Sequence, residues 1–200
     1  MKKTKSLVLN AHLLLIVWVA LLSGCATYGP DPIDKLAFQE RAHTKTQDGI
    51  TVRVVVLSAE ESEQAFGTSL YDEGIQPVWV HIENTTDNVF LLLENKVDRN
   101  YYSAHEAAWK SHYFASAAAN RSMDQYFNDL HIPLVIGAQQ TVSGFVYTNV
   151  DEGIKYVSVD LVKEGEYNSF WFVVEVPGLE ADYKRVDWDA LYTNDEIINF

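Results

Sequence analysis

The sequence has a single cysteine, Cys25, among its 200 residues. No disulfide can form within the chain, so its stability must come from packing even in an oxidising compartment. Basic residues are also few, because 15 lysines and arginines stand against 28 acidic residues, a formal net charge of −13. They form no cluster of the kind that binds nucleic-acid phosphates, so we expect no nucleic-acid partner.

The common catalytic signatures are missing as well. None of the ten glycines belongs to a G-x-G-x-x-G or P-loop pattern, and no serine lies in G-x-S-x-G. His105 and His112 are seven residues apart, a spacing that shares a helix face but differs from the four-residue spacing of zincins. We therefore predict two solvated histidines and no metal, with a metal site as the alternative.

No apolar run is long enough for a membrane-spanning helix, which needs about 20 residues. The strongest run, 13–22, follows a start that contains three lysines and leads into Leu22-Ser23-Gly24-Cys25. This arrangement resembles the signal of a bacterial lipoprotein. The resemblance implies that residues 1–24 are a signal peptide and that Cys25 carries lipid, with an uncleaved anchor as the alternative.

The lipoprotein resemblance also implies a location at a membrane of the bacterial cell envelope. Three acyl chains on Cys25 would hold the protein there, because a single chain binds only marginally. Ala26 stands where an aspartate is associated with inner-membrane retention, which favours the outer membrane. Because the predicted signal contains three lysines and no acid, its removal changes the net charge from −13 to −16.

The rest of the chain has the size of one ordinary domain. Residues 25–45 lack sustained periodicity and contain two of the five prolines, so we expect a lipidated tether with little structure of its own. Residues 46–200 are expected to form a single domain.

Apolar side chains alternate along Ile50–Val56, which predicts a strand with one buried face. A second strand is predicted over Val78–Glu83, where Val80 and Ile82 face the core and His81 faces solvent. The polar run Asn84–Asn88 would turn the chain into a returning strand at Val89–Leu93, forming a hairpin.

Three further segments alternate in the same way and predict a meander: Thr141–Thr148, Ile154–Val162 and Phe170–Val176. Ile132–Ile136 is a candidate edge strand, since its proline suits an edge. With the earlier strands, these segments predict a mainly β protein, an immunoglobulin-like antiparallel β-sandwich.

Two capping boxes predict helices within this β pattern. Ser58 and Glu61 begin a short helix that ends near Phe66. Ser103 and Glu106 begin a second, alanine-rich helical segment. We therefore expect a helical insertion at about residues 101–130.

Four short motifs of the β region combine turn glycines, a strand-opening proline and aromatic residues. They are Leu57-Ser58-Ala59-Glu60-Glu61, Gly74-Ile75-Gln76-Pro77-Val78-Trp79, Glu83-Asn84 and Ser143-Gly144-Phe145-Val146-Tyr147-Thr148-Asn149. Together they resemble the C-terminal domain of LssY-type bacterial membrane proteins, over about residues 45–178. The resemblance carries no catalytic assignment. In that family multi-span membrane segments are often attached to the domain, whereas a lipid anchor would replace them here.

Aromatic residues crowd the predicted helical insertion. Tyr101, Tyr102, Trp109 and Tyr113 are candidates for an interaction patch, and the last two are neighbours on a helix because they are four residues apart. The alternative is that these rings pack the insertion onto the sandwich, as aromatic residues at helical spacing usually do.

These observations predict a non-enzymatic, membrane-anchored lipoprotein that acts as an interaction module for a protein or another envelope component. The alternative is a small-ligand-binding lipoprotein with a pocket between the sandwich and the aromatic insertion. No cofactor is expected in either case. A hydrolase is a third alternative, and it would require a buried pair of a histidine and an acid in a cleft.

Overall fold

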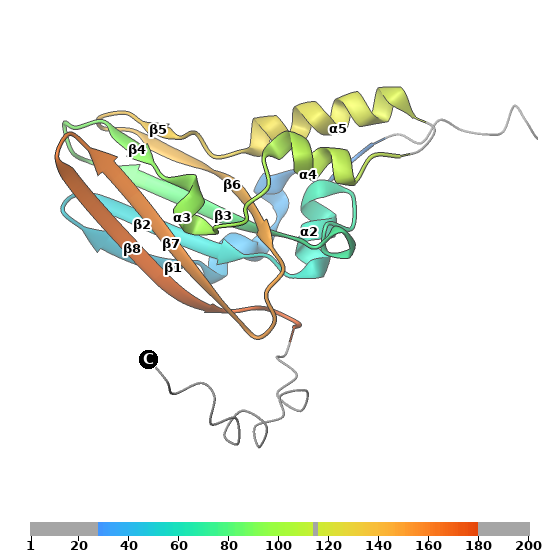
Figure 1. The fold of residues 1–200 in the computed structure, drawn as a ribbon, viewed down its shortest axis with the longest axis horizontal. Helices are drawn as coiled ribbons and strands as arrows, with labels where there is room; N and C mark the ends of the chain where they lie inside the picture. Colours follow the sequence, from blue (N-terminus) through green and yellow to red (C-terminus); the bar gives the residue numbers. More distant parts are fainter. Residues whose placement is uncertain (1–27, 114–115, 180–200) are drawn as a thin grey trace, which may run out of the picture.

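The computed structural model describes residues 28–113 and 116–179 (Figure 1). The predicted signal peptide, the predicted lipid site Cys25 and residues 180–200 lie outside the described residues. Within the described part the protein is mainly β, with two antiparallel sheets of four strands each.

The chain passes between the two sheets several times. Sheet A has the order β1-β2-β3-β6, and sheet B has the order β5-β4-β7-β8. The strands of sheet A are β1 (His43–Gln47), β2 (Ile50–Val56), β3 (Ile75–Asn84) and β6 (Thr141–Asn149). Those of sheet B are β4 (Phe90–Leu92), β5 (Val135–Ile136), β7 (Ile154–Lys163) and β8 (Glu166–Glu175).

Three helices gather at one end of the sheets, on the right in Figure 1, and we call this the helical end. They are α2 (Ala59–Phe66), α4 (Ala104–Lys110) and α5 (Ala117–Leu130). Shorter pieces are α3 (Glu94–Val97) and the 3₁₀ turns η1 (Ile33–Lys35), η2 (Ala37–Arg41) and η3 (Tyr71–Glu73). The helical insertion predicted at 101–130 is thus present, as two helices.

The predicted helix starts follow from side-chain caps. At α2 the Ser58 hydroxyl accepts from the Glu61 backbone N–H at 3.1 Å, and the Glu61 carboxylate accepts from the Ser58 N–H at 2.8 Å. This reciprocal pair satisfies two backbone donors that a helix start leaves free. At α4 the Ser103 hydroxyl accepts from Glu106 N–H at 3.2 Å, which is half of the predicted box.

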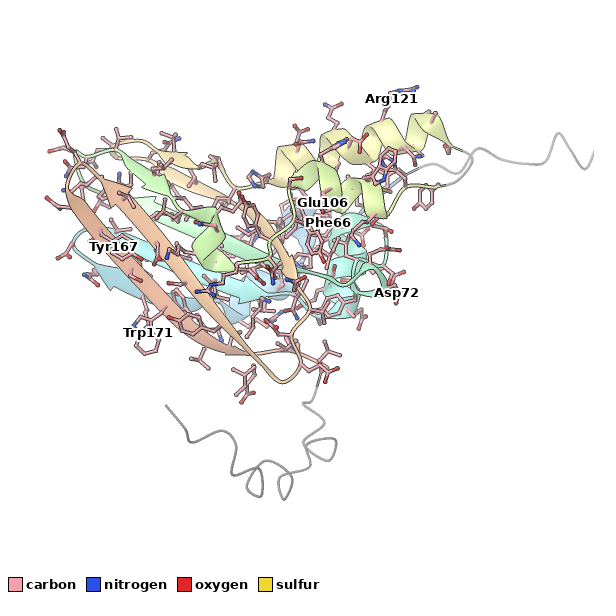
Figure 2. All side chains as sticks on the ribbon, viewed as in Figure 1. Phe66, Asp72, Glu106, Arg121, Tyr167 and Trp171 are labelled. Atoms are coloured by element: carbon pink, nitrogen blue, oxygen red, sulfur yellow. The ribbon has the colours of Figure 1, made fainter. Side chains whose placement is uncertain are left out.

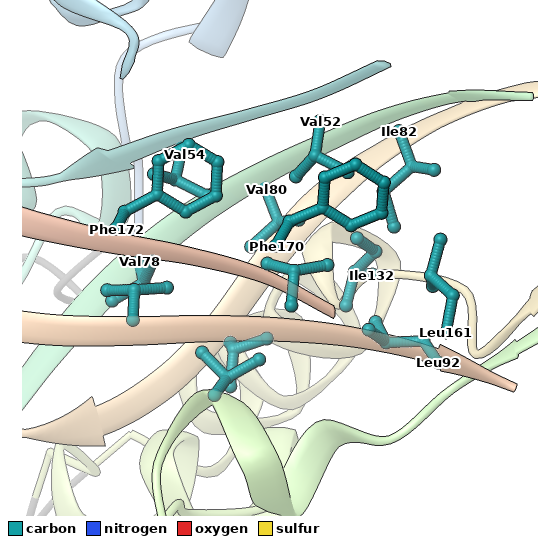
Figure 3. Close-up of a cluster of buried hydrophobic side chains, with 14 of the residues drawn as sticks. Val52, Val54, Val78, Val80, Ile82, Leu92, Ile132, Leu161, Phe170 and Phe172 are labelled. Carbon is teal, nitrogen blue, oxygen red and sulfur yellow. The ribbon is translucent and has the colours of Figure 1, made fainter. Parts of the chain in front are cut away.

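The first hydrophobic core lies between the two sheets (Figure 3). The alternating residues of β2 and β3 point inward from sheet A and meet Leu92, Leu161, Phe170 and Phe172 from sheet B. The predicted inner face of Ile50–Val56 is confirmed, because all four of its alternating apolar residues are buried.

A second core lies on the outer face of sheet A, beneath the helices. Phe66 of α2 is its centre, with ring centroids 4.9 Å from Phe127 of α5 and 5.0 Å from Phe145 of β6. Trp79 and Tyr147 belong to the same cluster. Sheet A is therefore buried on both faces at its helical end.

The predicted hairpin between Val78–Glu83 and Val89–Leu93 is wrong. β3 pairs with β2 along one edge and with β6 along the other, so it has no edge left for β4. The Asn84 amide donates to the carbonyls of Asn88 and Gly137, at 2.7 and 2.8 Å, and fixes the crossing from sheet A to sheet B.

The predicted meander of three strands is wrong in its first member. All three strands form, but β6 pairs with β3 in sheet A, and only β7 and β8 form a hairpin. The place beside β7 is taken by β4. The candidate edge strand is found at the edge of sheet B as the two-residue β5.

Residues 28–45, expected to have little structure of their own, are folded instead. Phe38 of η2 is buried in the second core, and the Arg41 guanidinium pairs with the Glu61 carboxylate. The same guanidinium donates to the Val56 carbonyl at 2.8 Å. Two 3₁₀ turns and a short polar strand carry no sustained periodicity, which explains why the pattern of the sequence missed them.

Candidate functional site

The four aromatic residues predicted as an interaction patch do not lie on one surface. Tyr102 and Tyr113 are partly buried against the second core. The Tyr102 hydroxyl donates to Asn149 Oδ1 at 3.0 Å, and that of Tyr113 donates to the Gly67 carbonyl at 3.3 Å. Tyr101 and Trp109 are exposed, Trp109 by 65 %. Half of the predicted patch therefore holds the helical insertion in place.

His105 on α4 and His112 just after this helix both lie near Asp124, an acid that the sequence pattern did not single out. His112 Nε2 lies 2.8 Å from Asp124 Oδ1 of α5, and His105 Nδ1 lies 3.8 Å from the same oxygen. His112 is therefore bound rather than solvated. Among the described residues, no group of three or more His, Asp or Glu side chains is arranged to hold a metal ion.

A second pair of a histidine and an acid joins α3 to the end of α5. His131 Nε2 lies 2.6 Å from Glu94 Oε1, and the glutamate is almost fully buried. Neither this pair nor His112–Asp124 lines either of the two pockets described below. Both pairs join neighbouring structural elements, which is a structural role.

The outer face of sheet B carries large apolar side chains that no described element covers. Phe170, Phe172 and Val174 of β8 point into the first core, so the residues between them point outward. Their neighbours across the hairpin follow the register, with Tyr156 of β7 opposite Val173 of β8. We call the outward set the aromatic sheet face: Tyr156 (60 % exposed), Tyr167 (55 %), Trp171 (53 %) and Val173 (55 %). Figure 2 places Tyr167 and Trp171 along β8, away from the helices.

Polar contacts hold the rings of this face in position. The buried Asp160 carboxylate accepts hydrogen bonds from the hydroxyls of Ser158 at 2.9 Å, Ser169 at 2.6 Å and Tyr167. The bond to Asp160 raises the pKa of the Tyr167 hydroxyl above its ordinary value, because it favours the protonated donor. Lys45 Nζ lies 3.8 Å from the centre of the Trp171 ring.

The sequence holds a signal for this face that the prediction did not use. An antiparallel sheet with one solvated face is expected to alternate apolar and polar residues. The β8 segment has aromatic or branched apolar residues on both faces, at 170, 172 and 174 inward and at 167, 171 and 173 outward. Such a strand at the edge of a sheet indicates that its outer face also contacts another surface.

An open pocket of about 650 Å³ lies beside the aromatic sheet face, between the 95–100 segment and the β6–β7 connection. Three of its lining residues, Asp98, Asn149 and Asp151, contact the buried Lys155: Nζ donates to Asp151 Oδ2 and to the Asn149 carbonyl, both at 2.7 Å, and lies 3.4 Å from Asp98 Oδ2. Lys96 and Arg99 also line the pocket, and no described residue forms an ion pair with either.

A second pocket of about 510 Å³ lies between η2 and α2. The Arg41–Glu61 pair is part of its lining. The ligand alternative predicted a pocket between the sandwich and residues 101–130, but no residue of that insertion lines either of these two pockets.

Among the described residues, no helix is long and apolar enough to cross a membrane. In comparisons with known proteins, no family model and no curated sequence matches this chain. The resemblances to bacterial lipoprotein signals and to LssY-type C-terminal domains therefore stay predictions from the sequence.

Proposed function

We propose that this protein is a non-enzymatic lipoprotein of the bacterial cell envelope that binds a partner protein through the aromatic sheet face. The observation that carries the proposal is the row of half-exposed rings on β7 and β8. Exposed apolar patches of this kind mark interaction sites in soluble domains. Tyrosine and tryptophan are also the residues most enriched at the centres of protein interfaces.

The rigidity of the face supports binding as its role. Tyr167 is fixed by its bond to Asp160, and Trp171 by its contact with Lys45. Side chains that are already ordered lose less conformational entropy when a partner immobilises them. The hairpin also presents them on strands rather than on a loop, which keeps their spacing constant.

We further propose that the fold is an immunoglobulin-like β-sandwich with a helical insertion, related to the LssY-type C-terminal domain. Two antiparallel sheets over a shared core, with repeated crossings between them, support this assignment. The location at the envelope, with the outer membrane favoured, rests on the sequence signal that ends at Cys25.

Site-specific photocrosslinking in a bacterial host tests the proposed interface. A photoreactive phenylalanine analogue would replace Val173 on the aromatic sheet face, or Arg53 on the exposed outer side of β2 as a matched control. We expect one reproducible protein adduct from position 173 and none of the same mass from position 53. Trp171→Ser should remove the adduct while the thermal unfolding midpoint stays close to that of the parent protein.

Three results would contradict the proposal. Identical adducts from both positions would show that the face is not selective. An adduct that persists in a Tyr167→Ser, Trp171→Ser double variant would show that the rings do not contribute to binding. An adduct with a lipid or glycan instead of a protein would replace the proposed partner class with another envelope component.

A second candidate function, small-ligand binding, is favoured by the pocket at Lys155. Asp98 and Asp151 already contact this ammonium group, whereas Lys96 and Arg99 have no ion-pair partner among the described residues. The two aspartates of the lining are compensated by the buried Lys155, so Lys96 and Arg99 are left without an acidic partner, within a chain whose net charge is −13. An anionic group is the ligand that such a pocket would favour.

Titration with inorganic phosphate, followed by amide chemical shifts, tests this candidate. We expect saturable shifts at Lys96 and Arg99 that disappear in an Arg99→Gln variant. Arg53→Gln is the control, because it removes the same charge from a distant strand. Shifts that do not saturate, or that survive in Arg99→Gln, would exclude an anion site here.

A further inference from the structure

The chain is packed from the first described residue onward. The Tyr28 ring lies 5.8 Å from the ring of Tyr126 on α5, centroid to centroid, and contacts the second core. Asp31 N–H donates to the Gln64 carbonyl of α2 at 2.9 Å. The chain therefore joins the domain at the helical end and is fixed there by both α2 and α5.

The distance between this point and the predicted lipid is short. Three residue steps separate Cys25 from Tyr28. An extended chain spans at most about 3.3–3.6 Å per residue, so these steps reach about 10 Å whatever their conformation. A lipid on Cys25 would therefore hold the helical end within about 10 Å of the bilayer surface.

The opposite end of the domain is much farther away. β3 begins at Ile75 in the helical end and runs ten residues to Asn84. A strand rises about 3.3 Å per residue, so its far end lies about 30 Å away. There the loops join one another, since Thr85 N–H donates to the Gly49 carbonyl and Gln139 N–H to the Thr86 carbonyl. We call these loops the distal end.

We propose that the helical end lies against the lipid headgroups of the membrane and that the distal end points away from it. This inference rests on the proposed lipidation of Cys25. The connection excludes the inverted orientation, in which the helical end would face away from the bilayer, because Tyr28 is packed at that end and only about 10 Å of chain separates it from Cys25.

The helical end also exposes side chains suited to a headgroup layer. Trp109 is 65 % exposed, and an indole presents both an apolar body and a polar N–H to such a layer. Arg121 lies on α5 at the outer tip of the helical end (Figure 2), where a cation can meet lipid phosphates. The acidic net charge of the chain opposes binding to anionic lipids, so the anchor, not the charge, imposes this contact.

The orientation explains how the aromatic sheet face stays available. The strands run from the helical end to the distal end, so the faces of both sheets lie parallel to the line that joins these two ends. The side of the domain that carries Tyr167 and Trp171 is then open to a partner near the membrane (Figure 2).

Fluorescence quenching in vesicles tests the orientation. The full chain would be produced in a bacterial host and reconstituted in phosphatidylethanolamine and phosphatidylglycerol vesicles that contain a headgroup-labelled quencher lipid. A fluorophore would be attached to Arg121→Cys or, as the matched control, to Asn88→Cys at the distal end; both positions are exposed. Lipidation consumes the thiol of Cys25, so each introduced cysteine is the only free thiol.

We expect severalfold stronger quenching at position 121 than at position 88. Equal quenching, or stronger quenching at 88, would overturn the proposed orientation. Intact-mass analysis of the same samples keeps the two proposals apart. A chain without lipid on Cys25 contradicts the proposed function, whereas a lipidated chain with the wrong quenching pattern contradicts only the orientation.

Discussion

Sheets A and B each turn an aromatic outer face away from the shared core, but the two faces differ in exposure. On sheet A, Trp79, Phe145 and Tyr147 are almost fully buried beneath the helices. On sheet B, Tyr167 and Trp171 are more than half exposed. The same residue types thus serve as core on one sheet and as surface on the other, so composition alone does not decide their role.

The connections between strands explain the difference. The link from β2 to β3 contains α2, and the long link from β4 to β5 contains α4 and α5; these helices pack on the outer face of sheet A. The link from β7 to β8 is the two-residue turn 164–165. Such a turn is too short to fold back over the hairpin, so the aromatic sheet face has no cover among the described residues.

The largest effect is expected from Phe66→Ala in the covered region. This substitution removes the ring at the centre of the second core, next to Phe127 and Phe145. Deletion of a buried aromatic ring costs about 3–5 kcal/mol of unfolding free energy. Urea unfolding followed by circular dichroism measures it. A loss below about 1 kcal/mol would mean that the helices do not cover sheet A stably.

Gly144→Ala should have the next largest effect. A Cβ at this position of β6 would come within 2.6 Å of the Ile132 Cα and N atoms, where the chain after α5 runs along the strand. Backbone must shift to admit the methyl group, so we expect a loss of about 1–3 kcal/mol. Gly29→Ala is the matched control, because its Cβ meets nothing within 4 Å. Equal stability of the two variants in urea would contradict the close approach.

Trp171→Ser on the open face should change stability little. The ring is half exposed, and its described cation contact is with Lys45, so we expect a loss below about 1 kcal/mol. The neighbouring Phe172 side chain points into the first core, so Phe172→Ala should cost about 3–5 kcal/mol of unfolding free energy. Comparable losses in the two variants would show that the aromatic sheet face is structural and would weaken its proposed role in binding.

Local sequence patterns predicted most elements of the fold but not their pairing. The alternation of Ile50–Val56 and the capping box at Ser58 depend only on residues close in the sequence, so both can be predicted from it. The partner of β3 is set by β6, which lies more than fifty residues later along the chain. No local pattern around Asn84–Asn88 carries that information, and a hairpin was therefore the natural but incorrect expectation.

The candidate site was predicted less well than the fold. Aromatic residues drew attention to the helical insertion, yet Tyr102 and Tyr113 pack against the core there. Trp171 was placed in the alternating strand Phe170–Val176, and Tyr167 was assigned to no element. Whether an outward ring is covered depends on other segments of the chain, so its exposure follows from the tertiary structure and not from strand periodicity.

His81 marks the border of the covered region, and its effect should be the smallest. Its ring stacks on Trp79 with centroids 5.6 Å apart, and β2 and β6 place Arg53 and Ser143 beside it. Burial, and then the charge of Arg53, lower the pKa of His81 below its ordinary value of 6.5, although Glu83 opposes them. Below 6.5 the unfolded chain then binds more protons than the folded one, so stability falls as the pH decreases. When the pH is lowered from above 6.5 to below it, the urea midpoint should fall more for the parent protein than for His81→Gln. The carboxylates titrate in the same way in both proteins, so they do not contribute to this difference. Equal drops would place His81 in free solvent, outside the covered half of sheet A.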